Sequence, residues 1–326
     1  MSIHINSQKY KIIKELGEGG NGKVYLVLNE KNNKYYAIKK ISIKYLEEED
    51  IELIKNEANI LSSINDEHIV KYFDSSQDEN DFNILMEYCE GLDLKKFINK
   101  FKVKNEFIDE KIIYTIALDL CLGIKIVHEN LLIHRDLKPE NLFIDDNYKI
   151  KIGDFGISKK LNENNRYAKT SIGTNNYMAP EVIKGEKYNN KVDIWSFGCI
   201  IYELFTLNVC FESKSLFGFV DKIVNKPHGK INTKMYNSKW QDLIDLLLKK
   251  NYKNRPDINQ VYELLINIDN EKIKNEDNSI QNDDSQKDNK NKTPNGFQKI
   301  SLEEIQNLRK KGNKINNIKG KKKYYF

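Results

Sequence analysis

An eight-residue segment and an aspartate downstream of it combine the side chains needed to handle a metal-bound phosphate. Residues 134–141 read HRDLKPEN, and Asp154 begins an Asp-Phe-Gly triplet. Asp136 can act as a base towards a hydroxyl group, and Lys138 can neutralise a phosphate. Asn141 and Asp154 offer hard oxygen ligands, which suit magnesium and the phosphate oxygens that share it. Each residue alone is most often an ordinary polar loop residue, but the combination favours phosphoryl transfer.

A glycine-rich turn lies between two β-like runs near the N-terminus. Residues 17–24 read GEGGNGKV, in which Gly17, Gly19 and Gly22 let the backbone approach a triphosphate and donate N–H groups to it. β-branched and aromatic residues follow, so the turn joins two strands and does not open a helix as a dinucleotide site requires. Val24 stands where a Walker loop needs Ser or Thr. Taken alone, the turn barely distinguishes a phosphate-binding loop from an ordinary hairpin.

A buried ion pair is predicted between the third strand and the first helix. Lys39 follows the apolar end of a strand, and Glu57 lies in the apolar stripe of the helix predicted over 47–64, beside Ile54 and Leu61. A carboxylate that faces the core is costly to bury unpaired, and Lys39 is the plausible partner. A solvated strand-end lysine and a glutamate that reaches water from the edge of the stripe remain alternatives.

The elements that position these residues fall into two groups. Five β-like runs precede residue 91: Tyr10–Leu16, Val24–Leu28, Lys34–Ile43, Ile69–Phe73 and Phe82–Tyr88. Helical patterns dominate afterwards: Ile108–Glu129, Lys191–Leu207, Lys239–Leu248 and Ile258–Ile268. The expected fold class is α+β, with a small β-rich lobe that contains one key helix and a larger helical lobe.

Together these motifs resemble those of eukaryotic serine/threonine protein kinases. The resemblance covers about Tyr10–Ile268 and includes residues 179–181 (APE) and 193–198 (DIWSFG). It implies the bilobal protein-kinase fold and transfer of the γ-phosphoryl group of ATP to Ser or Thr hydroxyls of protein substrates, with Mg²⁺ as cofactor and Mn²⁺ as an alternative. The chain is similar to the NIMA-related kinases, although residues 175–176 (NN) depart from their Pro/Tyr-containing text and leave the subfamily open.

The resemblance implies a role for each residue of the catalytic centre. Asp136 and Lys138 are the catalytic residues, and Asn141 and Asp154 are the metal ligands. The remaining implied residues line the nucleotide site. These ATP-binding residues are Leu16, Gly17, Gly19, Gly22, Val24, Ala37, Lys39, Glu57, Met86, Glu87, Cys89 and Phe143.

The resemblance also defines an activation segment, residues 154–181. Arg135 has no obvious carboxylate partner in the sequence, and in kinases with this arginine a phosphate on the segment commonly neutralises it. Thr170 and Ser171 are the candidate phosphorylation sites, to be modified by an upstream activating kinase, unless both are plain loop residues. Thr174 would contact the catalytic residues and position the substrate.

Further contacts are implied in the helical lobe. Glu181 is expected to pair with Arg255, and Asp193 is expected to hold the backbone of the catalytic loop. Asp93 and Glu140 fall where some kinases that favour basic substrates contact ribose or a substrate arginine. Protein substrates with basic residues near the target Ser or Thr are therefore expected to be tolerated.

The composition changes near residue 269. The Asn-, Asp-, Lys- and Ser-rich stretch beyond it cannot bury enough apolar surface to order itself, and Ser301 opens a short helix with a capping box. The expected organisation is an N-terminal extension (1–9), a kinase domain (10–268) with N-lobe 10–87, hinge 88–91 and C-lobe 92–268, and a polar disordered linker with a short helix and a basic tail (269–326).

Charge and cysteine content exclude several other classes of protein. The chain has 53 Lys+Arg and 48 Asp+Glu; 14 and 9 of these lie in residues 269–326, so the remaining 39 and 39 balance. A neutral body argues against nucleic acid as the main ligand, while the basic tail suits acidic surfaces. Four scattered cysteines suggest reduced thiols. No signal peptide or transmembrane segment is expected, and the predicted location is cytoplasmic, with the nucleus as an alternative.

Two other functions compete with a protein kinase. A catalytically silent scaffold of the same fold typically lacks the lysine, the base or the Asp-Phe-Gly aspartate, and this chain retains Lys39, Asp136 and Asp154. A small-molecule kinase of the same fold is disfavoured by Thr174 and by residues 179–181, which serve peptide docking in the family.

Overall fold

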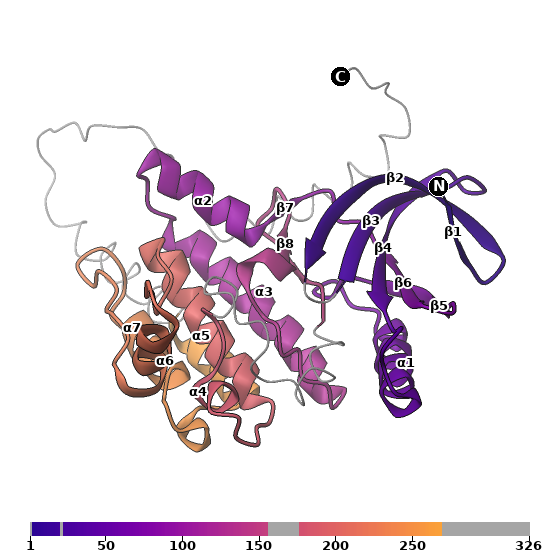
Figure 1. Ribbon diagram of the computed structural model, residues 1–326. Coiled ribbons are helices and arrows are strands. Elements are labelled where there is room, and N and C mark those ends of the chain that lie inside the picture. The colour runs from indigo at the N-terminus through magenta and orange to yellow at the C-terminus, as the bar shows by residue number, and fades with distance from the viewer. Residues whose placement is uncertain (1, 20–21, 156–175, 269–326) are drawn as a thin grey trace, which may run out of the picture. The chain divides into compact units, whose positions relative to one another are not determined.

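The computed structural model describes residues 2–19, 22–155 and 176–268. Contacts divide the chain into a unit Met1–Glu271 and a unit Lys272–Phe326, and every described residue belongs to the first. A curled β-sheet and one helix make up the N-terminal part of this unit, and helices dominate the rest (Figure 1). The predicted α+β architecture with two lobes is therefore confirmed.

The N-terminal sheet has six antiparallel strands in the order β1-β2-β3-β4-β6-β5. Their bounds are Ser2–Ile5 (β1), Gln8–Gly19 (β2), Gly22–Asn29 (β3), Lys34–Ser42 (β4), Tyr72–Gln77 (β5) and Asp81–Glu87 (β6). Alternate residues of the strands face one side, as the period of two predicts. This side buries an apolar cluster formed by Ile5, Tyr10, Val27, Ile38 and Leu85.

Strand β1 lies in residues that the sequence analysis leaves outside the domain. Asn6 and Ser7 connect it to β2 with positive φ angles of 45° and 65°, which suit a two-residue hairpin turn. The Asn6 amide donates hydrogen bonds to both carboxylate oxygens of Asp74 in β5, at 2.8 and 2.7 Å. The two edge strands of the sheet are thus joined. A four-residue strand is too short to show a period in the sequence.

The apolar run 69–73 does not form the strand that the sequence predicts. Strand β5 begins only at Tyr72 and continues through polar residues. Ile69 and Val70 instead pair with Ile152 of the other lobe, where the Val70 N–H donates to the Ile152 carbonyl at 2.8 Å. The prediction is wrong because this run serves a contact between the lobes, which local pattern cannot distinguish from a strand.

The helix of the N-terminal lobe agrees with its prediction. Helix α1 spans Glu48–Ser63, and three acidic residues in its first turn suit the positive end of the helix dipole. Its buried stripe contains the predicted apolar residues together with one carboxylate. The members of this stripe are Ile51, Ile54, Glu57, Ala58 and Leu61.

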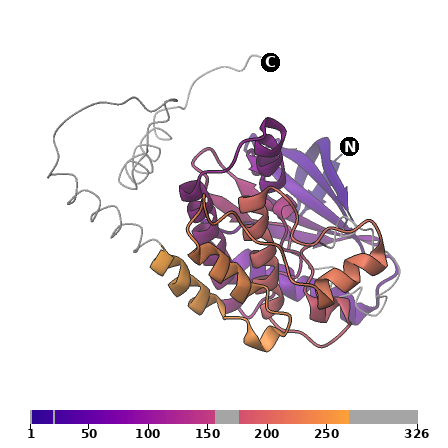
Figure 2. The same cartoon turned by 90° about the vertical axis from the view of Figure 1, so that its left-hand side faces the viewer.

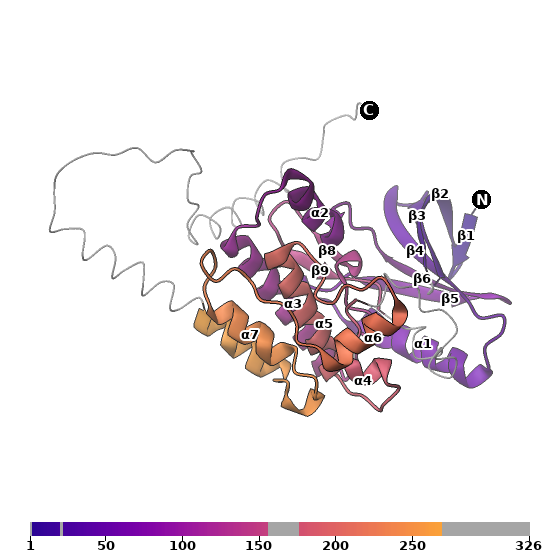
Figure 3. The ribbon, with the colours of Figure 1, turned by 60° about the vertical axis from the view of Figure 1, so that its left-hand side comes forward.

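The described part of the helical lobe contains the four predicted helices and three α-helices that the sequence analysis missed. The predicted ones are α3 (Glu110–Glu129), α5 (Lys191–Thr206), α7 (Lys239–Leu247) and residues 258–268, and the others are α2 (Leu94–Lys104), α6 (Leu216–Asn225) and the short α4 (Pro180–Ile183). These helices face the viewer in Figure 2. Helix α5 contacts both α3 and α7 (Figure 3) and is buried nearly all round, which fits its continuous apolar sequence.

A small antiparallel sheet of the helical lobe contains the strands next to the two catalytic motifs, since one strand directly follows residues 134–141 and another ends just before Asp154. Its strands are β7 (Leu92–Asp93), β8 (Leu142–Ile144) and β9 (Ile150–Ile152). The chain passes so close to β8 at Gly91 that an added Cβ would lie 2.4 Å from the Ile144 carbonyl oxygen, so only glycine fits there. No helix in the described part of the chain has the length and hydropathy to cross a bilayer.

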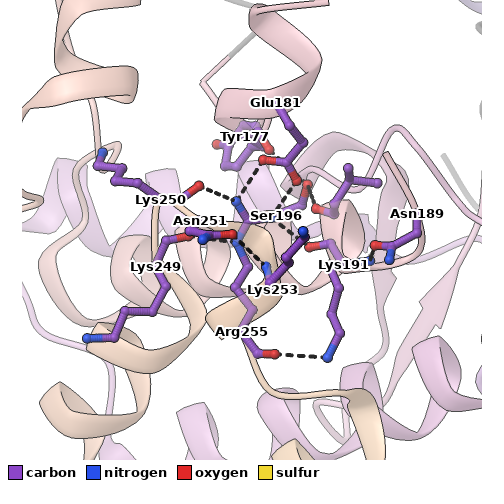
Figure 4. A network of polar contacts seen from close by, with 11 residues as sticks. Tyr177, Glu181, Asn189, Lys191, Ser196, Lys249, Lys250, Asn251, Lys253 and Arg255 are labelled. Carbon is purple, nitrogen blue, oxygen red and sulfur yellow. Dashed lines mark hydrogen bonds and ion pairs between the residues drawn. The ribbon is translucent and has the colours of Figure 1, made fainter. Parts of the chain in front are cut away.

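A buried ion pair joins α4 to the end of the helical lobe (Figure 4). The Arg255 guanidinium donates to the two carboxylate oxygens of Glu181 at 2.6 and 2.8 Å, as predicted. It also donates to the Lys191 and Lys249 carbonyls. The Ser196 hydroxyl donates to the Tyr177 carbonyl beside this pair. The end of the activation segment is therefore held against α5.

Replacement of Arg255 with Met leaves the Glu181 carboxylate, which is 2% exposed, without its guanidinium. We expect the free energy of unfolding to fall by about 3–5 kcal/mol, the cost of an uncompensated buried charge. Lys253→Met, which replaces an exposed lysine of the same segment, should alter the free energy of unfolding by no more than about 0.5 kcal/mol. Equal losses for the two variants in chemical denaturation would contradict a structural role for the pair.

Candidate active site

The backbone of the catalytic loop is held by one buried carboxylate, as predicted. Asp193 of α5 is 1% exposed and accepts hydrogen bonds from the backbone N–H groups of His134 (2.9 Å) and Arg135 (3.0 Å). It also contacts the His128 ring at 2.9 Å. Burial acts to raise the pKa of Asp193, but the hydrogen bond and charge of His128 outweigh it and lower that pKa. These contacts hold Arg135 at φ 66°, a conformation that non-glycine residues rarely adopt.

The His134 ring connects the catalytic loop to the Asp-Phe-Gly segment. Its Nε2 lies 3.0 Å from the Gly153 carbonyl oxygen, and its Nδ1 lies 3.3 Å from the Asp136 backbone N–H. A carbonyl only accepts and an N–H only donates, so the proton is on Nε2. Burial lowers the pKa of His134, against the opposing charges of Asp193 and Asp136. The ring packs at 4.6 Å from the fully buried Phe155.

Asp136, Lys138 and Asn141 form one hydrogen-bonded group. The Lys138 ammonium lies 2.9 Å from Asp136 Oδ2, and the Asn141 amide nitrogen lies 3.1 Å from the same oxygen. The amide also donates to the backbone carbonyls of Asp136 (2.8 Å) and, more weakly, Asp154 (3.5 Å). Because the amide nitrogen is used in this way, its oxygen is the atom that can serve a metal.

The charged residues around Asp154 pair differently from the prediction. Lys39 of β4, only 2% exposed, forms an ion pair with Asp154. Glu57 of α1 pairs with Arg135, whose Nη1 lies 3.2 Å from Glu57 Oε1. The predicted Lys39–Glu57 pair is therefore wrong for this structure, and Arg135 has a carboxylate partner that was not obvious from the sequence. With two cations and two carboxylates converging, the sequence cannot decide which cation each carboxylate meets.

Five predicted nucleotide-site residues meet in one apolar cluster. Ala37, Val70 and Met86 form its buried part, and the half-buried members are Val24, Cys89 and Phe143. Ala37 and Met86 are cross-strand neighbours. Sequence reasoning missed Val70, which belongs to the run that was assigned to a strand. The cluster spans the sheet, the hinge and β8, so it presents an apolar surface suited to a flat ring.

The glycine-rich turn joins β2 to β3, as predicted. Gly22 has φ 114°, and a Cβ there would lie 2.2 Å from the Lys40 carbonyl oxygen, so glycine is required. At Gly17 a Cβ would meet nothing within 4 Å. Packing within the protein therefore does not explain that glycine. Gly19 is paired with Gly22, and Leu16 is 40% exposed at the irregularity just before Gly17.

The hinge offers backbone groups and an inert thiol. The Glu87 carboxylate pairs with Lys151 at 2.6 and 2.8 Å, and the Glu87 N–H donates to the Lys71 carbonyl. Burial, with the nearby Glu87 charge, raises the pKa of the Cys89 thiol to about 12. That thiol stays protonated at neutral pH, so recognition at Cys89 falls to its backbone.

The donor set fits a divalent cation that a phosphate ligand helps to hold. Asn141 and Asp154 provide oxygen atoms, and the side chain of Asp154, a residue with φ 50°, is 31% exposed. Among residues 2–19, 22–155 and 176–268, no group of three or more His, Cys, Asp or Glu side chains could hold a metal. Two protein ligands suit magnesium, which usually completes its shell with substrate phosphates and water.

Three predicted residues lie outside the described part of the chain. They are the phosphorylation candidates Thr170 and Ser171 and the substrate-positioning residue Thr174. The next residue that the structure describes is Asn176, just before the segment that contains Glu181.

Residues 10–264 match the family model for the protein kinase domain. Similar curated proteins include the probable serine/threonine-protein kinase nek2 of Dictyostelium discoideum, 35% identical over 258 residues (78% of this chain, 61% of that protein). Serine/threonine-protein kinase Nek5 of Homo sapiens is 36% identical over 254 residues (78% and 36%), and Nek1 of Mus musculus is 34% identical over 256 residues (78% and 21%). The chain therefore spans less than two thirds of these relatives. The predicted resemblance to NIMA-related kinases is confirmed.

The lowered pKa of His134 predicts how stability depends on pH. The histidine has a pKa of about 6.5 in the unfolded chain. As the pH decreases below this value, the unfolded chain binds a proton that the buried ring does not, so the free energy of unfolding decreases. We expect His134→Gln to reduce this loss between about pH 7 and 5.5 by up to about 1.4 kcal/mol per pH unit.

Denaturant titrations at both pH values measure this difference, and comparison between variants cancels the other titrating groups. Replacement of the exposed His4 with Gln is the matched control. An unchanged pH dependence in His134→Gln would contradict the assignment of a buried neutral ring.

Proposed function

Because the chain belongs to the protein kinase domain family, we propose that it is a serine/threonine protein kinase that transfers the γ-phosphoryl group of ATP to protein hydroxyls. The observation that carries this proposal is the group formed by Asp136, Lys138 and Asn141, with Asp154 beside it. The proposed catalytic domain spans residues 10–268, with the hinge at 88–91.

Asp136 is the proposed base. Its carboxylate accepts the hydrogen bond of the substrate hydroxyl, aims the oxygen at phosphorus and takes the proton late in transfer. Lys138, already beside that carboxylate, neutralises charge on the transferring group. Asn141 and Asp154 hold the divalent cation, proposed to be Mg²⁺ with Mn²⁺ as a substitute. When bound, the cation neutralises phosphate charge and orients the γ-phosphoryl group.

The proposed nucleotide site uses the apolar cluster and the glycine-rich turn. Adenine lies against the cluster defined above, with backbone groups of Glu87 and Cys89 at its edge. Gly17, Gly19 and Gly22 let the turn approach the phosphates. Leu16, directly before the turn, is also a proposed ATP-binding residue. Lys39 is the proposed phosphate contact, and Glu57, which pairs with Arg135, is the proposed acidic residue at the edge of the same site.

The proposed substrates are proteins in the cytoplasm or nucleus. All four cysteines are free thiols, which suits a reducing compartment. Glu140 is the proposed contact for a basic residue near the target. The other candidate, Asp93, is less available, because its carboxylate already accepts the Lys96 backbone N–H and pairs with the Lys96 ammonium. The basic residues beyond Glu304 are proposed to contact acidic surfaces.

Asp136→Asn keeps the shape of the side chain but cannot accept the proton. We expect the rate of phosphate transfer to a generic protein to fall about 10²–10⁴-fold, the usual contribution of a general base. Binding of metal-ATP, measured by calorimetry, should persist. Asp146→Asn removes an exposed carboxylate nearby and is the matched control. Equal transfer by wild type and Asp136→Asn would favour the catalytically silent scaffold.

Phosphorylation of Thr170 or Ser171 is proposed to activate the enzyme by drawing Arg135 away from Glu57. A phosphate carries a charge of about −1.5 to −2 and pairs strongly with a guanidinium. We expect Thr170→Ala/Ser171→Ala to lower transfer at least about tenfold, the worth of one charge-assisted hydrogen bond. Ser158→Ala, in the same segment, is the control. Full activity of the double variant after treatment with an activating kinase would reject the switch.

A further inference from the structure

An ion pair that the proposed mechanism does not use joins the hinge to the helical lobe. The Lys151 ammonium of β9 lies 2.6 and 2.8 Å from the two carboxylate oxygens of Glu87, at the end of β6. Glu87 Oε2 also accepts a hydrogen bond from the backbone N–H of Lys71 at 3.2 Å. The side chains of Lys151 and Glu87 are 33% and 31% exposed, so the contact is partly shielded from water.

Lys151 supplies the positive charge at Glu87, and its place in the small sheet explains how it reaches the hinge. The ammonium of Lys71, the other lysine beside Glu87, donates to Asn65 Oδ1 at 2.8 Å. Lys151 is the cross-strand partner of Phe143, and such partners share one face of an antiparallel pair. Phe143 belongs to the apolar cluster that is proposed to bind adenine. The ion pair therefore lies at the adenine end of the proposed nucleotide site.

The strand that contains Lys151 leads directly to the proposed metal ligand. Ile152 is joined to the segment before β5 by two backbone hydrogen bonds of 2.8 Å. At Gly153 an added Cβ would lie 2.7 Å from the Phe143 ring, so the backbone packs directly against the apolar cluster. Asp154 is the next residue. Both residues between Lys151 and Asp154 are thus held in place, and the position of Lys151 is transmitted to Asp154.

A second ion pair between the lobes provides a comparison. Lys149, two residues before Lys151, pairs with Glu67 of the N-terminal lobe, but these side chains are 39% and 65% exposed. Exposed pairs of this kind contribute little unless their geometry is fixed. The geometry of Glu87 is fixed, because both of its oxygens meet the Lys151 ammonium and one also accepts a backbone N–H. The two pairs therefore differ in how firmly they hold the lobes.

We propose that Lys151 is a positioning residue for the nucleotide, because its contact with Glu87 fixes the hinge at a set distance from the strand that leads to Asp154. This inference rests on the proposed kinase function. Adenine is proposed to bind at the hinge and the phosphates at the metal, so one ligand has to fit both ends at once. With the distance fixed in advance, the whole nucleotide binds without the entropic cost of bringing the two ends into register.

The test measures dissociation constants by calorimetry for three probes, which are adenosine, Mg²⁺-tripolyphosphate and Mg²⁺-ATP. In Lys151→Met we expect the constant for Mg²⁺-ATP to rise about three- to fivefold, the upper range for a partly exposed ion pair. The constants for adenosine and Mg²⁺-tripolyphosphate should stay within about 1.5-fold of wild type, because each of these probes uses one end of the site only. Lys149→Met is the matched control and should bind all three probes as wild type does.

Three further variants keep the test decisive. Lys151→Arg retains the charge and should bind Mg²⁺-ATP within about twofold of wild type, since a guanidinium also suits a carboxylate. Glu87→Gln removes the charged pair but can still accept the Lys71 N–H, so it replaces Lys151→Met if that variant fails to fold. Glu87→Gln/Lys151→Met should bind Mg²⁺-ATP no more weakly than either single variant, because both changes remove the same contact.

The possible outcomes separate the inference from the proposed function. An unchanged constant for Mg²⁺-ATP in folded Lys151→Met or Glu87→Gln would overturn the inference. An equal weakening of adenosine binding would also overturn it, because Lys151 would then support the hinge alone. Wild type that binds no Mg²⁺-ATP would instead overturn the proposed function itself.

Discussion

The active site depends on the burial of one carboxylate, Asp193, beneath the catalytic loop. Its two oxygens accept hydrogen bonds from consecutive backbone N–H groups and so hold Arg135 at a positive φ angle. The helix that carries Asp193 is apolar almost all round, so it is fixed by packing on every side. A loop with a strained residue thereby acquires the rigidity of the core, which positions Asp136 with little conformational freedom.

Two ion pairs between the lobes lie next to this loop. Lys39 and Arg135 meet Asp154 and Glu57, so each cation has a carboxylate although the pairing differs from the one that the family resemblance implies. The proposed metal ligand Asp154 and the proposed phosphate partner Arg135 therefore belong to one set of four charged residues.

Much of the fold followed from local pattern, and the failures have identifiable causes. The helix containing Glu57 and the helix containing Asp193 were predicted within a residue or two because their apolar periodicity is strong. The run 69–73 was misassigned because Val70 contacts Ile152 and belongs to the apolar cluster with Ala37 and Met86. Strand β1 is too short to carry a period, and its edge is secured by the distant Asp74.

The sequence by itself determined which residues are proposed to carry the chemistry, because the catalytic loop, the Asp-Phe-Gly triplet and the glycine-rich turn are local motifs whose order and residue types are sufficient. It also specified the pair Glu181–Arg255, once the family was apparent. Only the tertiary structure decided the partners of Lys39 and Arg135, which lie 115 and 78 residues from them along the chain. An ion pair depends on distance in space and on burial, and neither is encoded by spacing along the sequence.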